Sequence, residues 1–187
     1  ALEPISGFIE NIIPLFREHN NAYLELRTKS TQIRNLLSIE PLQNCIVAFS
    51  LSDQDTATDI EHKTPSLQKR LDALVKLQRH GWPIGTRFDP VLYHPDYQQR
   101  YGNLFKNVFE QLDATKIHSV SLGSLRLPNS FFKKISALYP EEPLFARPFE
   151  TRNNLTAYTS DIADPLHHFC ETELLKYISP SIYFPCF

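Results

Sequence analysis

The chain of 187 residues contains no methionine and only five glycines. The glycines form neither a GxGxxG nor a GxxxxGK[ST] pattern, and no GxSxG motif occurs, so the common phosphate-binding loops and the serine-hydrolase elbow are excluded. Loss of the initiator methionine usually leaves internal methionines. We therefore expect these residues to be a piece of a longer protein or a processed product.

Cysteine is also scarce, and its three positions are Cys45, Cys170 and Cys186. An odd, widely spaced set argues against a disulfide framework and favours a reducing, cytoplasmic compartment. We expect Cys45 and Cys186 to be buried apolar residues. Helical spacing places His167 and Cys170 on one face, next to His168, but two ligands do not make a metal site. We therefore predict no bound metal. Nothing local in the sequence supports a Cys/His nucleophile, and that arrangement stays open.

Strong charge and long apolar runs are absent as well. The net charge is -2, so no overall basic field indicates nucleic acid, and any contact with DNA would need a local patch. No apolar run approaches the roughly 20 residues of a membrane span, and the first residues do not resemble a signal peptide. The content of 42% hydrophobic and 21% charged residues is typical of one soluble globular domain.

Strand and helix patterns alternate along the first three quarters of the chain. The expected strands cover 21–30, 44–52, 82–91 and 116–127, and the expected helices or turns cover 5–20, 31–38, 64–81, 96–113 and 128–140. The helix over 64–81 has Thr64 as a candidate N-cap, Pro65 in its first position and Gly81 at its end. This alternation predicts parallel strands joined by right-handed crossovers.

Every expected strand has one apolar side and one small or charged side. In the first, Leu24 and Leu26 alternate with Glu25, Arg27 and Lys29. An open sheet covered by helices on both faces would need central strands that are apolar on both sides. We therefore predict an α/β fold, a partial (β/α) barrel of TIM type, with four sequential parallel strands and helices on one face only. The polar side would line a ligand site.

Active sites of such barrels lie at the carboxyl ends of the strands. The side chains expected there are Lys29, Ser50, Asp89 and Arg126. A fixed cation at Lys29 suits a carboxylate or a phosphate, with Glu25 holding Arg27 or Lys29 in place. The alternatives stay open: Lys29 pairs with Glu25 or is solvated, Asp89 ends its strand before Pro90, and Arg126 is a surface residue.

Residues 142–187 depart from the alternating pattern and form an expected C-terminal extension to the domain of residues 1–141. Asn153 and Asn154 indicate a turn between two short strands. A helix should follow with Asp164 as its cap, and the apolar end over 181–187 should dock in an extended form on the body.

The segments "LELRTKS", "VAFSLS", "EHKTPSLQKRLDALVKLQRHGWPIGTRFDPVLYH" and "SVSLGSLRLP" follow the order and spacing of the spore photoproduct lyase family. The resemblance covers nearly all of residues 5–140, and "EHKTPSLQKRLDAL" to "FDPV" is its most specific part. This family belongs to the radical S-adenosylmethionine (SAM) enzymes. The resemblance implies a (β/α)6 partial barrel, of which this chain holds about four units, and lyase chemistry that repairs a thymine lesion in DNA through a 5′-deoxyadenosyl radical.

The resemblance also implies cofactors and site residues. Lys29 falls on the lysine that binds the methionyl part of SAM, Ser50 on a SAM-binding serine, and Asp89 near the adenosine, where the spore enzymes carry a small residue. The candidate substrate-binding residues are Arg87, Arg126 and Arg152. The chain lacks the CX3CX2C motif that holds a [4Fe–4S] cluster, so we expect the cluster ligands upstream and no catalytic competence in this chain alone.

Two other functions compete with this one: a non-catalytic α/β module that binds SAM or a nucleotide, and a structural domain completed by another chain. The expected partners are DNA in the full-length protein and either a missing N-terminal segment or a second copy. The free edge of the strand over 24–29 would favour such association. No contact with a membrane is expected.

Overall fold

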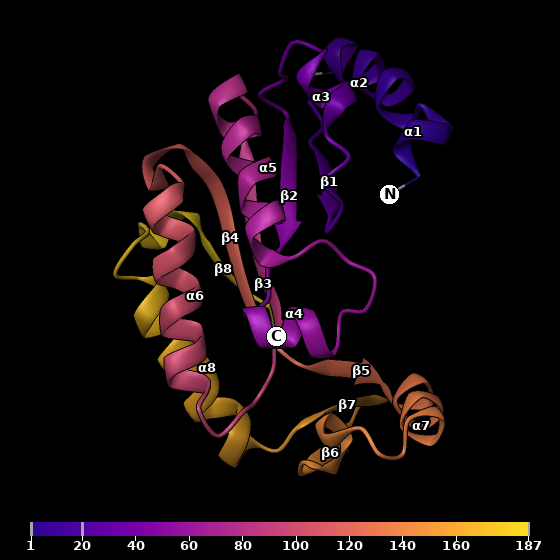
Figure 1. The fold of residues 1–187 in the computed structure, drawn as a ribbon, viewed down its shortest axis with the longest axis vertical. Helices are drawn as coiled ribbons and strands as arrows, with labels where there is room; N and C mark the ends of the chain where they lie inside the picture. Colours follow the sequence, from indigo (N-terminus) through magenta and orange to yellow (C-terminus); the bar gives the residue numbers. More distant parts are fainter. Residues whose placement is uncertain (1, 20, 187) are drawn as a thin grey trace.

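The computed structural model describes residues 2–19 and 21–186, which build a mixed α/β fold around a five-stranded parallel sheet (Figure 1). The order of strands is β1-β2-β3-β4-β8. Their bounds are β1 Leu24–Thr28, β2 Cys45–Ser50, β3 Ile84–Val91, β4 Ile117–Ser124 and β8 Tyr183–Pro185. The first four strands pair in sequential order and all in parallel, as the sequence predicts, and the sheet is consistent with a partial barrel.

Three long helices cover one face of this sheet: α5 (Leu67–His80), α6 (Tyr97–Gln111) and α8 (Ser160–Leu174) (Figure 1). Their apolar stripes and the apolar side of the strands form a single buried core. At its centre, the rings of Phe88 on β3 and Phe105 on α6 meet edge to face with centroids 5.0 Å apart. The predicted one-sided covering of the sheet is confirmed for these helices.

The ends of α5 differ in part from the expectation. Ser66, not Thr64, is the N-cap, and its hydroxyl accepts a hydrogen bond from the Lys69 amide. Thr64 lies two residues before this cap, where its hydroxyl donates to the Glu61 carbonyl and accepts from Nη2 of Arg70. The other end is as predicted: Gly81 takes a φ of 106°, in the left-handed region that glycine accepts without strain.

The chain begins with two short helices where one was expected. α1 (Glu3–Ser6) and α2 (Phe8–Glu18) are separated by Gly7, whose φ of 56° breaks the helix, while α2 continues through Pro14. Ile9 and Ile13 attach α2 to the core. The remaining short helices are α3 Arg34–Leu37 and α4 Gln54–Asp59, with 3-10 turns at Ala114–Lys116, Pro143–Ala146 and Pro180–Ile182.

The fourth predicted strand is two strands in the structure. β4 ends at Ser124, and β5 (Arg126–Pro128) leaves for a second, antiparallel sheet of order β5-β7-β6. This small sheet consists of β5, β6 (Phe149–Arg152) and β7 (Leu155–Tyr158), with α7 (Asn129–Leu138) against it. The predicted turn at Asn153 and Asn154 is confirmed, since both residues have positive φ values.

The C-terminal segment completes the main sheet. α8 begins at Ser160 after Thr159, so the expectation that Asp164 caps it is wrong, and Asp164 lies inside the helix. The expected docking of the end is confirmed in a specific form, because β8 pairs in parallel with β4. Gly123 allows this approach: a Cβ there would lie 2.7 Å from the Cys186 carbonyl oxygen.

Candidate functional site

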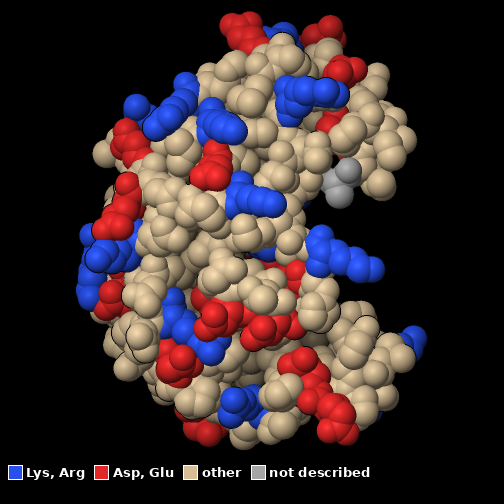
Figure 2. Space-filling view, in the orientation of Figure 1, with Lys and Arg blue, Asp and Glu red and all other residues tan. Residues whose placement is uncertain are grey.

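The face of the main sheet opposite the long helices carries the polar sides of the strands. Register places Arg27, Ala48 and Gly85 side by side on three neighbouring strands. One step along, Ser50, Arg87 and Ser121 are neighbours in the same way. In the space-filling view the molecule is hollowed on one side, between the N-terminal helices and the small sheet, and blue side chains project at the rim (Figure 2). This inner face is therefore the candidate site.

Arg87 is the centre of the buried part of the inner face. Its guanidinium group donates to both carboxylate oxygens of Glu25, at 3.1 and 2.8 Å, and to the backbone and side-chain oxygens of Ser119. The group lies back over Gly85, where a Cβ would be 2.8 Å from Nη2. The hydrogen bond from Arg87 lowers the pKa of the Glu25 carboxyl. The expectation that Glu25 holds Arg27 or Lys29 is therefore wrong: its hydrogen-bond partner is Arg87.

Arg27 joins two of the predicted ligand residues at the carboxyl ends of the strands. Its Nε donates to the Ser50 hydroxyl at 3.2 Å, and its Nη2 donates to the Asp89 carbonyl at 3.1 Å. The Asp89 carboxylate lies 3.7 Å from this Nη2 and 3.4 Å from Nη1 of Arg126. β3 runs through Pro90 to Val91, so Asp89 lies within the strand and does not end it.

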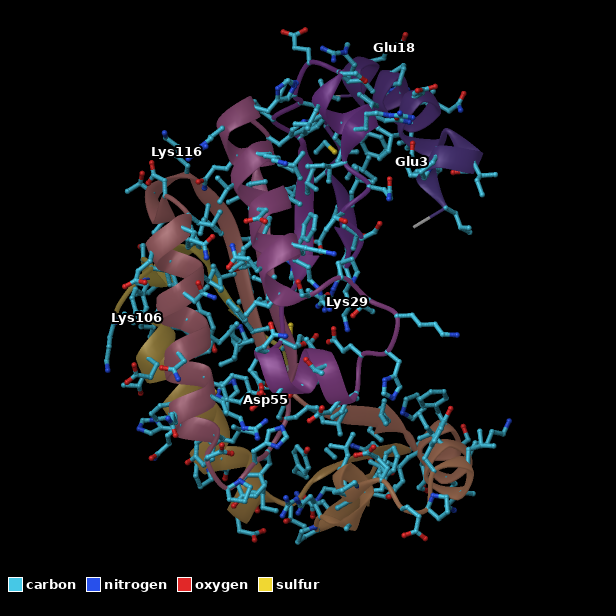
Figure 3. All side chains as sticks on the ribbon, viewed as in Figure 1. Glu3, Glu18, Lys29, Asp55, Lys106 and Lys116 are labelled. Atoms are coloured by element: carbon cyan, nitrogen blue, oxygen red, sulfur yellow. The ribbon has the colours of Figure 1, made fainter. Side chains whose placement is uncertain are left out.

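Lys29 lies just beyond the end of β1 (Figure 3) and belongs to a second group of charged side chains, separate from the one around Arg27. Its ammonium donates to Oε1 of Glu61 at 2.7 Å, and the same oxygen accepts from the Ser52 hydroxyl at 2.5 Å. The other oxygen of Glu61 accepts from Nη2 of Arg70 at 2.5 Å. Burial opposes ionisation of Glu61, but the hydrogen bonds from Lys29, Ser52 and Arg70 lower the pKa of its carboxyl.

Sequence reasoning missed Glu61 and Arg70 as members of the site. Both lie in the segment "EHKTPSLQKR", which carries the most specific part of the family resemblance. Arg70 sits on an otherwise apolar helix face and is fully buried. A buried arginine requires a partner, so this position in the stripe of α5 was the available signal.

Arg152 lies apart from the other predicted residues, on the hairpin of the small sheet. Its side chain is 75% exposed and pairs with Glu150 at 2.9 Å. Alternation along β6 and β5, with Ala157 opposite both Glu150 and Arg126, places Arg152 and Arg126 on the same face of that sheet. Arg126 and Arg152 thus share one face of the small sheet, and the candidate cations form no single cluster.

A hollow of about 370 Å³ opens on the inner face. It is lined by Glu25, Arg27, Arg87, His118, Ser119, Ser121, Phe184 and Cys186. Its size is within the range of small-molecule sites.

Cys186 lines this hollow and is half-buried, whereas Cys45 is fully buried. The expectation of a buried apolar residue is therefore confirmed for Cys45 and wrong for Cys186. Desolvation raises the pKa of the Cys45 thiol to about 12.

Within residues 2–19 and 21–186, no three histidine, cysteine or acidic side chains come close enough together to hold a metal ion. The side chains of this part of the chain therefore do not fit an iron–sulfur cluster. The helices of the same residues include none that is long and apolar enough to cross a membrane.

Comparison with known families decides the relationship. The sequence model of the spore photoproduct lyase family matches residues 1–153. The chain belongs to the spore photoproduct lyase family. Two curated members are a spore photoproduct lyase of Clostridium acetobutylicum, 23% identical over 143 residues, and one of Bacillus subtilis, 25% identical over 114 residues. These alignments cover 76% and 61% of this chain but only 42% and 32% of the relatives.

Solved structures of this family share the fold. A spore photoproduct lyase complexed with dinucleoside spore photoproduct superposes with a TM-score of 0.73 at 20% identity, over 88% of this chain and 51% of that one. A mutant enzyme with bound AdoMet and the same dinucleoside gives a TM-score of 0.71 at 20% identity, over 86% and 50%. The chain thus spans about half the length of the structures it matches.

Proposed function

We propose that this chain forms the SAM-binding half of a radical SAM lyase related to spore photoproduct lyase, acting on damaged DNA. The observation that carries the proposal is the position of Lys29, Ser50 and Asp89 at or near the carboxyl ends of three consecutive parallel strands, in a chain of this family. A solved structure of the family with bound AdoMet and dinucleoside spore photoproduct supports the two proposed ligands, SAM and damaged DNA.

The residues at this end fit the polar parts of SAM. The Lys29 side chain is 38% exposed, and its hydrogen bond to Glu61 uses one of its three donors, so its ammonium can receive the methionyl carboxylate. The Ser50 hydroxyl accepts from Arg27, which leaves its own proton for a ligand oxygen. Asp89, held by Arg27 and Arg126, would face the adenosine part. Bound SAM would supply the radical chemistry of the family, with its [4Fe–4S] cluster held by other segments of the whole protein.

The candidate substrate residues divide by exposure. Arg126 and Arg152 have side chains 28% and 75% exposed and lie on one face of the small sheet, where they can contact phosphate groups of DNA. Arg87 is 7% exposed, and its donors are taken up by Glu25, Ser119 and the Thr86 carbonyl, so we assign it to orienting Glu25 in the hollow and not to direct contact with DNA.

The test is a calorimetric titration of SAM into the cluster-loaded complete gene product, comparing Lys29→Ala with the wild type. A charge-assisted contact contributes about 1.5–3 kcal/mol, so we expect affinity to fall roughly tenfold to a hundredfold with folding nearly intact. Lys106→Ala removes the same charge at a side chain 65% exposed and should leave affinity unchanged. Equal affinities of wild type and Lys29→Ala would exclude the proposed role of Lys29, and absence of SAM binding by the wild type would exclude the function.

A further inference from the structure

The segment between α4 and α5 holds the amino group that the proposed function assigns to SAM. We infer that Glu61 is a positioning residue: anchored by Arg70, it fixes the ammonium of Lys29 for the carboxylate of the ligand. The inference rests on the proposed SAM site and adds to it a group that does not itself touch the ligand.

Arg70 provides the anchor because its guanidinium group donates several hydrogen bonds and its side chain is fully buried. Its Nε donates to the Pro65 carbonyl at 2.8 Å, and its Nη1 donates to the Ser50 carbonyl at 3.1 Å. Its Nη2 donates to the Thr64 hydroxyl at 2.7 Å as well as to Glu61. The guanidinium group is thereby tied to the end of β2, the strand that carries Ser50.

Glu61 transmits this fixed position to Lys29. The Glu61 side chain is 10% exposed, and both of its carboxylate oxygens accept hydrogen bonds. One accepts from Arg70, and the other accepts from Ser52 and Lys29. Lysine has a flexible four-carbon stem and loses rotamer freedom when a ligand orders it. A lysine that is already ordered avoids this loss on binding, which is the physical gain of preorganisation.

The cluster of Lys29, Glu61 and Arg70 has a net positive charge that one bound anion would neutralise. Two cations, Lys29 and Arg70, share the single carboxylate of Glu61, so the three side chains carry a net charge of +1. A ligand carboxylate on the remaining donors of Lys29 would neutralise the cluster without breaking the contact with Glu61. Glu61 therefore supports the ligand and does not compete with it.

A double-mutant cycle on the cluster-loaded complete gene product tests this inference by SAM titration. Glu61→Gln should weaken binding roughly threefold to tenfold, the range for ordering one long side chain on binding. In the Lys29→Ala background, the same change should have less than about a twofold further effect, because Glu61 acts only through Lys29. Glu110→Gln, at a carboxylate 62% exposed, removes the same charge and should change nothing.

A second measurement separates positioning from general support of the fold. In proton–nitrogen correlation NMR, the ammonium protons of Lys29 should be detectable in the wild type because the hydrogen bond to Glu61 slows their exchange with water. The signal should disappear in Glu61→Gln, while thermal unfolding still shows that this variant is folded. If Glu61→Gln does not fold, Ser52→Ala replaces it in the cycle, since it removes one bond to Oε1 of Glu61 and no charge.

Four results would overturn the inference. Equal losses in both backgrounds would mean that Glu61 acts independently of Lys29, and tighter binding of SAM by Glu61→Gln would make it a competitor for the ammonium. If Lys29→Ala binds SAM like the wild type, the proposed role of Lys29 is wrong and the inference with it. If Lys29→Ala weakens binding but Glu61→Gln does not, the inference alone is wrong.

Discussion

Charged residues on the inner face depend on small neighbours. Arg87 lies along the sheet only because Gly85 has no side chain, and Ala48 is the next residue in register toward β1, where Glu25 receives the guanidinium group. Cations and carboxylates then partly neutralise each other: Arg27, Arg87 and Arg126 lie against the two carboxylates of Glu25 and Asp89, which leaves a net charge of +1. Such networks are stable only when each buried charge keeps its partner.

At the residue scale we predict that Glu61 makes stability depend on acidity. The pKa of its carboxyl is below the usual 4.5, so the folded state favours the ionised form. The contribution of the ionised Glu61 carboxylate to the free energy of unfolding is fully present above pH 4.5. It is lost as the pH falls through the lowered pKa that Glu61 has in the folded protein. Glu61→Gln should lose about 3 kcal/mol of unfolding free energy at pH 7, since it leaves buried Arg70 without its anion.

Urea unfolding at pH 7 and at about pH 4 measures this dependence. The deficit of Glu61→Gln relative to the wild type should narrow at the lower pH, whereas the exposed control Glu110→Gln should show little deficit at either. A deficit of the same size at both values would assign the effect to packing instead of charge.

At the scale of elements, β8 is a strand of only three residues, and within residues 2–19 and 21–186 it pairs on one side alone. It holds its place through its pairing with β4 and through the amide of Cys186, which donates to the Leu122 carbonyl at 2.7 Å. The absence of a side chain at Gly123 lets the two segments approach. The position of Phe184 and Cys186 in the hollow follows from this pairing.

We therefore predict that Gly123→Ala displaces β8. The new methyl group would lie 2.7 Å from a backbone oxygen, which cannot move aside as a side chain would. The expected cost is about 1–3 kcal/mol, measured by thermal or urea unfolding, with loss of amide protection at Cys186 in hydrogen exchange.

Gly102→Ala is the matched control for this change. Gly102 lies in α6 with no atom within 4 Å of the added methyl group, so alanine should stabilise the helix by about 0.5–1 kcal/mol. Similar effects of the two substitutions would show that contact with the C-terminal segment does not limit Gly123.

At the scale of the whole molecule, β1 is an edge of the main sheet, and no strand among the described residues pairs with its outer side. A groove of about 370 Å³ runs beside it, and its lining includes Phe8 and Ile9 of α2 together with Ile33 and Leu36. An open edge next to apolar side chains promotes association. The chain spans about half the length of the solved structures that it matches.

We predict that the isolated chain self-associates through this edge. Sedimentation velocity should show species larger than the monomer, increasing with concentration. Phe8→Glu should shift the population toward monomer, because it places a charge in the groove at a side chain 49% exposed, where the core loses little. Leu138→Glu, at a leucine 73% exposed on α7, should have no such effect. A wild-type chain that remains monomeric throughout would show that the edge is not adhesive.

The sequence by itself determined the alternation of strands and helices, the parallel order and the two-sided strands. The two sides of each strand are a local property, since hydrophobic periodicity within each segment fixes which side faces the helices. The parallel order follows from the alternation, since a helix between two strands returns the chain to the same end of the sheet. It also indicated which residues reach the carboxyl ends of the strands, among them Lys29, Ser50 and Asp89.

Only the tertiary structure decided which charges pair. Glu25 and Arg87 are 62 positions apart, and Lys29 and Glu61 are 32 apart, so neither pair leaves a signal in local sequence. The same holds for β8, which reads as an apolar end and becomes a strand only because β4 offers it a free edge. Strand register and side-chain reach across the sheet fix these contacts, and both arise only once the segments have packed together.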